Sequence, residues 1–425
     1  MSVAHQPPLP PEPNLPQPGP TLKLEKDAGK KIVSFLKKWI LLPLLGALIS
    51  AVVIGRLIDW VVGPNSYKVY IVGNISEPET KEIADAFIGV GELPKINRIP
   101  VEVKEVDDSG DPDIAERISL HLASLSDTLL VVGHLESTPT QKALPAYLQI
   151  ADPPIPVILT TETNPNLLPP KSVVGGYYPV FRLSPTDTDQ AEKAASFMLS
   201  KPAAVIWVVE DTSNPVYSRY LAREFVRQVH KNPSAKVLLW STNYNIPPAY
   251  AISELGINWV FFAGEWQDAL VLIRQLKTMP QTRKVNILLT DWCVDTRLLQ
   301  EGGTDVENVY LTHALTPTVY NQGRYTVFGK DASQIVRRLL LDGDQHFDQF
   351  AGADGRNGYW LRRVLGLRRV GDARWAIARV MESAALLKQP FTLADGVQAT
   401  FGGDSNRTDA SFQVWQIRNN KFSNP

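Results

Sequence analysis

The chain has 425 residues, which is more than one ordinary hydrophobic core holds, so its length predicts two domains with appendages. Lysine and arginine together number 43, against 44 aspartates and glutamates, and this balance lacks the basic excess typical of nucleic-acid-binding domains. Cys293 is the one cysteine, which excludes an internal disulfide framework and a zinc site made of several cysteines. The six histidines are scattered, and none pair at a spacing typical of metal ligands.

The N-terminal part of the chain predicts a membrane anchor. Residues 1–21 are dominated by proline and are expected to form an extended spacer, with a ligand for an adaptor domain as the alternative. Several lysines then precede an apolar run at 39–62, which begins WILLPLLGALISAVVIG. A membrane span needs about 20 apolar residues, and lysines gather on the cytoplasmic side of a span. We therefore expect residues 1–38 to form a cytoplasmic tail and residues 39–62 to form a single-pass transmembrane helix in the inner (cytoplasmic) membrane.

The rival interpretation of this segment is a cleaved signal peptide. The region before the apolar run is long for a signal peptide, and no small-x-small cleavage motif follows the run. No cysteine stands at the end of the run, which excludes a lipoprotein anchor. The prediction is thus an uncleaved signal anchor, with the remaining chain in the periplasm or another extracytoplasmic space.

From residue 67 onward, apolar runs of strand length alternate with segments of helical periodicity. This alternation predicts an α/β protein with parallel sheets flanked by helices. The first elements expected are a strand at 68–72, a helix at 77–90 with Ile83, Ala84, Phe87 and Ile88 on its buried face, an edge strand at 99–106, a helix from about 112 to 125, a strand at 129–132, a helix at 139–150 and a strand at 155–159. The later elements expected are a strand at 177–182, a helix at 189–199, strands at 203–209 and 236–240 around a helix at 216–230, a helix at 250–255, a strand at 259–262, a helix at 268–277, and strands at 285–289 and 309–311.

The segment 323–374 has a less legible pattern. Four arginines in it, at 362, 363, 368 and 369, predict a solvated surface helix, with a phosphate or lipid site as the alternative. A clear helix is expected at 375–387 and a last strand at 411–417.

Two polar turns within residues 128–165 are candidate ligand contacts. GHLEST follows one predicted strand and TTETNP follows the next, with helix starts close behind. Ligands collect at the carboxyl ends of parallel strands, and the free N–H groups of a helix start favour anions such as a carboxylate.

The sequence contains none of the common catalytic motifs of nucleotide-binding proteins, α/β-hydrolases or zinc proteases. Asp107 and Asp108 stand in a turn, where capping of the next helix is the expected role. His134 has no nucleophile or metal ligand nearby in the sequence, so we interpret it as a structural hydrogen-bonding residue, and Cys293 as buried bulk. These patterns predict neither an enzyme nor a cofactor.

The order of elements and six turns resemble type I periplasmic binding proteins, specifically the leucine/isoleucine/valine-binding branch of ABC-transporter receptors. The segments that carry the resemblance are EVDDSGDPDIAERI, VVGHLESTPTQ, TTETNPNL, FRLSPTDTDQA, VVEDTSNPVYSRYLAREF and FQVWQIRNNKF. The resemblance covers most of residues 67–425. It implies two α/β lobes joined by a hinge that the chain crosses several times, with lobe 1 at 66–182 plus about 318–400 and lobe 2 at 183–317 plus about 401–425.

The resemblance also implies a set of ligand contacts. Ser137 and Thr138 correspond to the residues that hold the ligand carboxylate, and Thr161 and Thr163 fall in the turn that meets its ammonium group. Across the cleft the corresponding positions are Tyr217, Trp266 beside Glu265, and Asp291 as the acid that meets the ammonium.

Three departures from the family pattern bear on the ligand. GNISEPETKE replaces the usual Gly-Pro-rich first turn, Glu162 replaces a small residue beside the cleft, and Ser218 stands where glycine is usual. An acid at 162 is expected to reject a carboxylate or to bind a second cation.

The function implied is a membrane-anchored solute-binding protein of an ABC importer. Its partners would be the permease subunits and a small polar solute, an amino acid and by default a branched-chain one, with no nucleic acid and no cofactor. The alternative is a ligand sensor that signals through its membrane span to a separate partner.

Overall fold

The structure is a computed structural model that describes residues 64–168, 179–233, 235–242, 247–352, 369–394, 396–402 and 406–425, without the side chains of 350–352. The predicted cytoplasmic tail and transmembrane helix lie outside these ranges. Within the described part of the chain, no helix is both long and apolar enough to cross a bilayer.

The first sheet contains five strands, and every pairing in it is parallel. The strands are β1 (Tyr67–Gly73), β2 (Val101–Asp107), β3 (Thr128–Gly133), β4 (Val157–Leu159) and β5 (Val180–Arg182), and their spatial order is β2-β1-β3-β4-β5. The connecting helices are α3 (Pro78–Gly89), α4 (Pro112–Ser124) and α5 (Ser137–Pro145), which continues into a π-helix at Ala146–Ile150. The predicted edge position of β2 is confirmed.

The second sheet contains seven strands and is mixed. Its strands are β6 (Val205–Glu210), β7 (Lys236–Thr242), β8 (Trp259–Ala263), β9 (Asn286–Leu289), β10 (Tyr310–His313), β13 (Gln413–Arg418) and β14 (Lys421–Ser423), in the order β14-β13-β10-β9-β8-β6-β7. The helices that pack against it are α6 (Asp187–Leu199), α7 (Pro215–Val229), α8 (Ala249–Glu254), α9 (Trp266–Thr278) and α10 (Thr296–Gly302). The strand β13 pairs antiparallel with both β10 and β14, whereas the sequence pattern predicted parallel sheets. A tight turn after Arg418 joins β13 and β14, and such a hairpin connection gives antiparallel strands.

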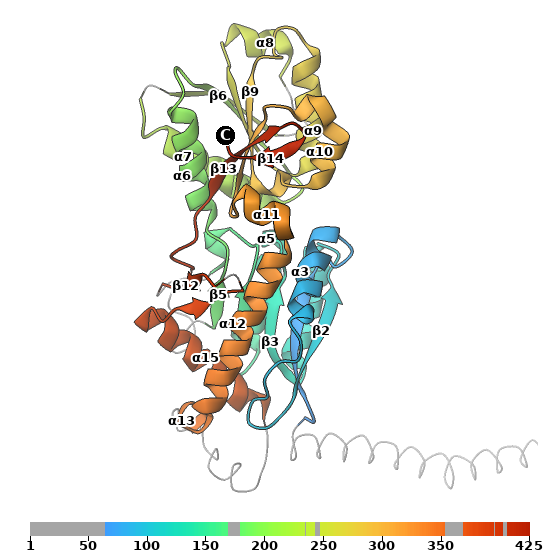
Figure 1. Ribbon diagram of the computed structural model, residues 1–425, viewed down its shortest axis with the longest axis vertical. Helices are drawn as coiled ribbons and strands as arrows, with labels where there is room; N and C mark the ends of the chain where they lie inside the picture. Colours follow the sequence, from blue (N-terminus) through green and yellow to red (C-terminus); the bar gives the residue numbers. More distant parts are fainter. Residues whose placement is uncertain are drawn as a thin grey trace, which may run out of the picture. The chain divides into compact units, whose positions relative to one another are not determined.

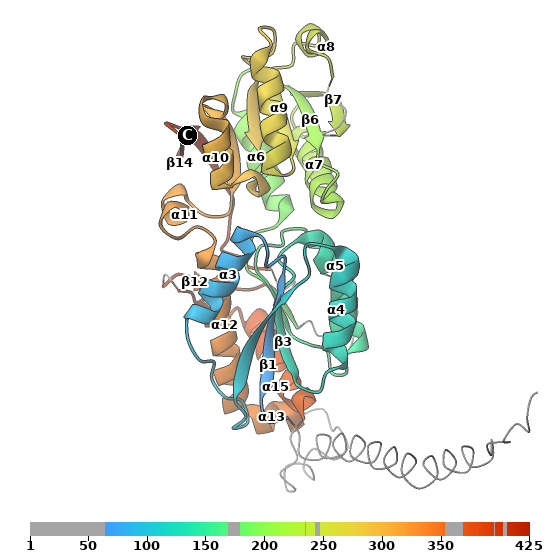
Figure 2. The ribbon, with the colours of Figure 1, turned by 90° about the vertical axis from the view of Figure 1, so that its right-hand side faces the viewer.

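Between β10 and β13 the chain returns to the first sheet. Helix α11 (Pro317–Gly323) is followed by α12 (Thr326–Gln345), α13 (Phe347–Gly352) and α15 (Val370–Leu387), and then by a small hairpin of β11 (Phe391–Thr392) and β12 (Gln398–Ala399). Figures 1 and 2 show α12 beside α3, although the two helices are far apart in the sequence.

Both sheets carry helices on both faces, because their strands are apolar on both sides. In β1, Val69 and Ile71 pack in the core beneath α3, α12 and α15, while Tyr70 and Val72 face the core beneath α4 and α5. Figure 2 shows these two layers on either side of the first sheet. The second sheet repeats the arrangement, with α9 and α10 against one face and α6 and α7 against the other.

The turn before α4 has the predicted capping role. Asp111 is the N-cap, and its carboxylate accepts hydrogen bonds from the backbone N–H groups of Asp113 (2.8 Å) and Ile114 (3.0 Å). Pro112 follows at the first helical position, where its missing N–H costs nothing.

One detail of the sequence prediction is wrong. Ile88 was expected on the buried face of α3, but its side chain is 42% exposed, and Thr80 joins Ile83, Ala84 and Phe87 on that face instead. The segment 323–374, whose sequence pattern is less legible, contains α12, a 20-residue helix with ten buried residues. Of the four arginines in the predicted surface helix, 362, 363 and 368 lie outside the described residues.

Candidate functional site

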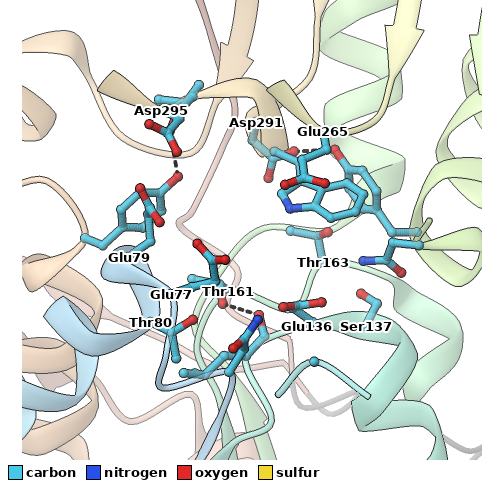
Figure 3. A pocket seen from close by; sticks show the side chains of 18 of the residues that line it. Glu77, Glu79, Thr80, Glu136, Ser137, Thr161, Thr163, Glu265, Asp291 and Asp295 are labelled. Atoms are coloured by element: carbon cyan, nitrogen blue, oxygen red, sulfur yellow. Dashed lines mark hydrogen bonds between the residues drawn. The ribbon is translucent and has the colours of Figure 1, made fainter. Parts of the chain in front are cut away.

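A cavity of about 400 Å³ is lined by loops from both sheets. From the first sheet come the loops that follow the carboxyl ends of β1, β3 and β4, and from the second sheet come those that follow β6, β8 and β9. Figure 3 shows the side chains of Glu77, Glu136, Ser137, Thr163 and Glu265 around this space. Parallel strands bring their carboxyl ends to one edge of a sheet, so residues distant in the sequence meet here.

Six of the seven predicted ligand contacts line this cavity: Ser137, Thr161, Thr163, Tyr217, Trp266 and Asp291. The seventh, Thr138, does not line it. Its hydroxyl donates a 2.5 Å hydrogen bond to Oδ1 of Asn214, a residue in the loop after β6. The role of all seven predicted residues in binding a ligand stays a prediction.

Glu162 is a structural residue in this region rather than part of the cavity wall. Its side chain is 1% exposed, and its carboxylate accepts hydrogen bonds from the backbone N–H groups of Leu135 (2.9 Å), Thr160 (2.7 Å) and Thr161 (3.0 Å). The hydroxyl of Thr161 in turn donates to the carbonyl of Leu135 at 2.7 Å. Burial raises the pKa of the Glu162 carboxyl, and the backbone hydrogen bonds act in the opposite direction. Glu162 therefore ties the loop after β3 to the loop after β4.

Asp291 is the polar centre of the wall formed by the second sheet. It accepts hydrogen bonds from the hydroxyl of Tyr217 (2.6 Å) and from the side-chain amide of Gln190 (2.8 Å). Burial raises the pKa of Asp291 and raises that of Tyr217 well above its usual value, so the tyrosine keeps its proton and donates it. The ring of Trp292 meets that of Tyr217 edge to face, with centroids 5.8 Å apart.

Aromatic residues complete this wall. The indole ring of Trp266 lies 5.1 Å from the guanidinium carbon of Arg297, a distance typical of a cation–π contact. Trp266 is only 6% exposed, and among the described residues its Nε1 has no hydrogen-bond acceptor. A buried indole N–H normally finds an acceptor, so this donor is left unsatisfied within the described part of the fold.

The lining carries many more acids than bases. Six carboxyl groups line the cavity, from Glu77, Glu79, Glu136, Glu265, Asp291 and Asp295, against the single guanidinium of Arg297. His313 also lines it, but burial lowers the pKa of its imidazole to about 3, so the ring is neutral at physiological pH.

Two of these acids have pKa values of about 7. For Glu136, burial is the main cause, and the charges of Asp108 and Glu265 raise the pKa further. For Glu79, burial is again the main cause, followed by the charge of Asp295, with which it shares a hydrogen bond (Figure 3). Acids clustered in this way favour protonation or a bound cation.

Charged groups also link α3 to the second sheet's loops. The guanidinium of Arg297 lies 2.6 Å from Asp295, 3.3 Å from Glu79 and 3.4 Å from Glu77. Arg324 reaches the same helix through Glu79 at 3.4 Å. Apart from Asp295, which is buried, these side chains are partly exposed, so each pair with Glu77 or Glu79 is worth about 1 kcal/mol or less.

His134 and Cys293 have structural surroundings, as predicted. Nδ1 of His134 lies 2.7 Å from Asp108 and Nε2 lies 2.9 Å from the hydroxyl of Tyr147, and all three side chains are buried. The thiol of Cys293 donates to the carbonyl of Gly264, and burial raises its pKa well above the usual value. No group of three or more potential ligands that could hold a metal ion occurs among the described residues.

The sequence pattern predicts Asp291 and, beside Trp266, Glu265 in this site, but it does not identify Glu77, Glu79, Glu136 or Asn214. The signal available for them was position, because each closely follows a predicted strand end or opens the helix after it. Counting the acidic residues close to the predicted strand ends would therefore have predicted an acidic site.

Comparison with known proteins gives a structural likeness without a sequence match. No protein-family model matches the chain, and no curated protein matches it in sequence. An ABC-transporter substrate-binding protein from Desulfitobacterium hafniense in complex with Leu aligns with a TM-score of 0.60 and 13% identity, over 84% of this chain and 99% of that one. The leucine-binding protein LivK from Thermotoga maritima gives 0.61 and 16%, over 84% and 99%. The described chain has the type I periplasmic-binding-protein fold.

A third solved structure with this fold has a different kind of ligand. It is a solute-binding protein of an ABC transporter from R. palustris in complex with 4-hydroxybenzoate, with a TM-score of 0.62 and 14% identity over 85% of this chain and 95% of that one. The ligands in these structures are thus an amino acid in one case and an aromatic acid in another, and the shared fold alone does not define the solute.

Proposed function

We propose that the chain is an extracytoplasmic solute-binding protein, which captures a small polar solute in the cavity between its two sheets and delivers it to ABC permease subunits. The observation that carries the proposal is the cavity of about 400 Å³ at the carboxyl ends of strands from both sheets, in a fold whose solved examples bind small molecules. The arrangement of a few polar groups with an aromatic wall suits a ligand of that size.

The proposal includes the membrane anchor and the division into lobes. Residues 39–62 would hold the protein in the inner membrane, with residues 1–38 in the cytoplasm and the binding domain outside. Lobe 1 would comprise 66–182 and about 318–400, and lobe 2 would comprise 183–317 and about 401–425. Protease treatment of intact spheroplasts tests the orientation, because an external binding domain is digested while the tail at 1–38 is protected.

The solute proposed carries an amino group, and a branched-chain amino acid is the starting candidate. Thr161, Thr163, Tyr217, Trp266 and Asp291, which line the cavity, would contact the solute, and Ser137 would donate a hydrogen bond to it. His134 and Cys293 offer no support for the enzyme alternative, since both are buried and hydrogen-bonded within the fold.

A thermal-shift screen of the full chain in mild detergent tests the function. A ligand at about 100 times its Kd adds roughly 2.7 kcal/mol of stability, which raises Tm measurably. Small-angle scattering at saturating ligand then tests closure, and we expect the radius of gyration to fall as the lobes close by hinge motion. A solute that stabilises the protein with no compaction would contradict closure, and no stabilisation by any small solute would contradict the function.

A further inference from the structure

The charge of the cavity points to a narrower class of solute, and this step rests on the proposed function. An α-amino acid brings a carboxylate as well as an ammonium group, so its receptor needs donors for the first and acids for the second. The lining here supplies six carboxyl groups and one guanidinium, and that guanidinium already lies within 3.4 Å of Asp295, Glu79 and Glu77. A ligand carboxylate would meet little uncommitted positive charge.

The donors that could replace a positive charge are mostly occupied by the protein itself. The backbone N–H groups of Leu135 and Thr161 donate to the buried carboxylate of Glu162. The hydroxyl of Thr161 donates to Leu135, and the hydroxyl of Thr138 donates to Asn214. Among the four predicted polar contacts contributed by the first sheet, two hydroxyls are therefore committed within the fold.

The N-terminus of α5 carries a carboxylate of its own. Glu136 is the N-cap residue, but its side chain does not cap the helix and instead lines the cavity (Figure 3). The N-terminus of a helix attracts anions, but here the carboxylate of Glu136 lies beside it and would repel the carboxylate of a ligand.

The indole N–H of Trp266 is a candidate donor for the other end of the ligand. Trp266 lines the cavity, is 6% exposed, and has an indole N–H without an acceptor among the described residues. This N–H would donate to a neutral oxygen of the ligand, such as an amide carbonyl or a hydroxyl. The rings of Tyr217, Trp266 and Trp292 line the cavity, and the face of an aromatic ring attracts an organic cation.

We propose that the solute is a small organic amine without a free carboxylate, whose ammonium group lies between Glu136 and Glu265 and whose neutral oxygen accepts from Trp266. Amides of amino acids and amino alcohols have this chemistry. The acids on the two sides of the cavity come from opposite sheets, since Glu136 follows β3 and Glu265 follows β8. A bound ammonium group would therefore draw the two sides together.

Matched pairs of ligands test the inference on the full chain in mild detergent. Leucine is compared with leucinamide and leucinol, and the same comparison is made for the alanine, phenylalanine and glutamine series, with benzoate as an anion. We expect at least one amide or alcohol to bind about tenfold more tightly than its amino acid, as the loss of one charge repulsion predicts. Tighter binding of the amino acids or of benzoate would overturn the inference and leave the proposed function in place. No binding by any compound would overturn both.

Variants locate the ammonium group. Glu136→Gln removes one charge with little change of shape, and should weaken the amine about tenfold, since a hydrogen bond to a charged group is worth about 1.5 kcal/mol or more. Glu265→Gln should do the same from the other side. Glu116→Gln on α4, an exposed residue away from the cavity, is the matched control and should leave the affinity unchanged. Melting curves of the free proteins check folding, and a well-folded Glu136→Gln protein with full affinity for the amine would overturn the placement.

Discussion

The loops after β3 and β4 contain two glutamates in opposite situations. Glu162 is buried and accepts three backbone hydrogen bonds, so its charge is satisfied within the fold. Glu136 lines the cavity, makes no capping bond, and is surrounded by other acids. Backbone donors at this end of the first sheet therefore serve the protein's own carboxylate, and the acids that lack such donors give the cavity its negative charge.

The largest effect expected from this comparison is on stability. Glu162→Ala leaves the N–H groups of Leu135, Thr160 and Thr161 without their acceptor in a buried setting. Each unsatisfied donor costs about 1–3 kcal/mol. Because water can fill part of the space that the removed side chain leaves, we expect the unfolding free energy to fall by about 3–5 kcal/mol. Chemical denaturation measures this change. The exposed Glu116→Ala is the control and should change stability by about 0.5 kcal/mol or less.

The second effect concerns pH and amine affinity. The pKa of Glu136 is about 7, and the charged groups that raise it, besides burial, are Asp108, Glu265, Glu77 and Glu162. Below that pH the carboxyl is neutral, and above it the carboxylate attracts a cation, so affinity should rise with pH. For leucinol, whose amine stays protonated, we expect about a tenfold gain between about pH 6 and pH 8. Calorimetric titration measures it, and Glu136→Gln should flatten the profile. A wild-type affinity that falls over this range would contradict the assignment.

A smaller effect should follow from the loss of one hydroxyl in the other wall. Tyr217→Phe removes the 2.6 Å hydrogen bond to Asp291 while the bond from Gln190 remains. We expect a loss of about 1–2 kcal/mol in unfolding free energy, with the ring packing against Trp292 preserved. Denaturation curves for Tyr217→Phe and for Tyr250→Phe, an exposed tyrosine on α8, separate this bond from a general effect of removing a hydroxyl.

The smallest effect is expected at Ser137. Its side chain lines the cavity at the first position of α5. Ser137→Ala should lower the affinity for the bound solute about threefold, as the loss of one neutral hydrogen bond predicts, with Tm of the free protein unchanged. A loss of a hundredfold would instead indicate a carboxylate anchor at this helix start, and would weaken the contrast drawn with Glu162.

Much of the fold could be predicted from the sequence because its signals are local. Strands such as β3 and β8 are continuous apolar runs, and α4 begins with Asp111 as a capping residue. Helix α12 was missed because polar and small residues interrupt its buried face. One of them is Gly329, where a side-chain carbon would lie 2.1 Å from the carbonyl oxygen of Ile83, so the close approach of α12 to α3 requires glycine.

The site was predictable as a set of loops but not as a charge distribution. Ser137, Thr163 and Asp291 stand at strand ends that the pattern identifies, and all three line the cavity. The partners of Thr138 and Glu162 depend on how two loops meet in space, and no local pattern encodes that contact. The sequence suggested that an acid at 162 would face the ligand, whereas the structure buries it among backbone N–H groups.

The measurement that tests the cavity's proposed role most directly is a crystal structure of the complex with the tightest-binding amine. We predict that its ammonium nitrogen lies within about 3 Å of a carboxylate oxygen of Glu136 or Glu265, and that Nε1 of Trp266 donates to its neutral oxygen. A ligand carboxylate held at the N-terminus of α5, or a ligand outside the cavity, would contradict this account.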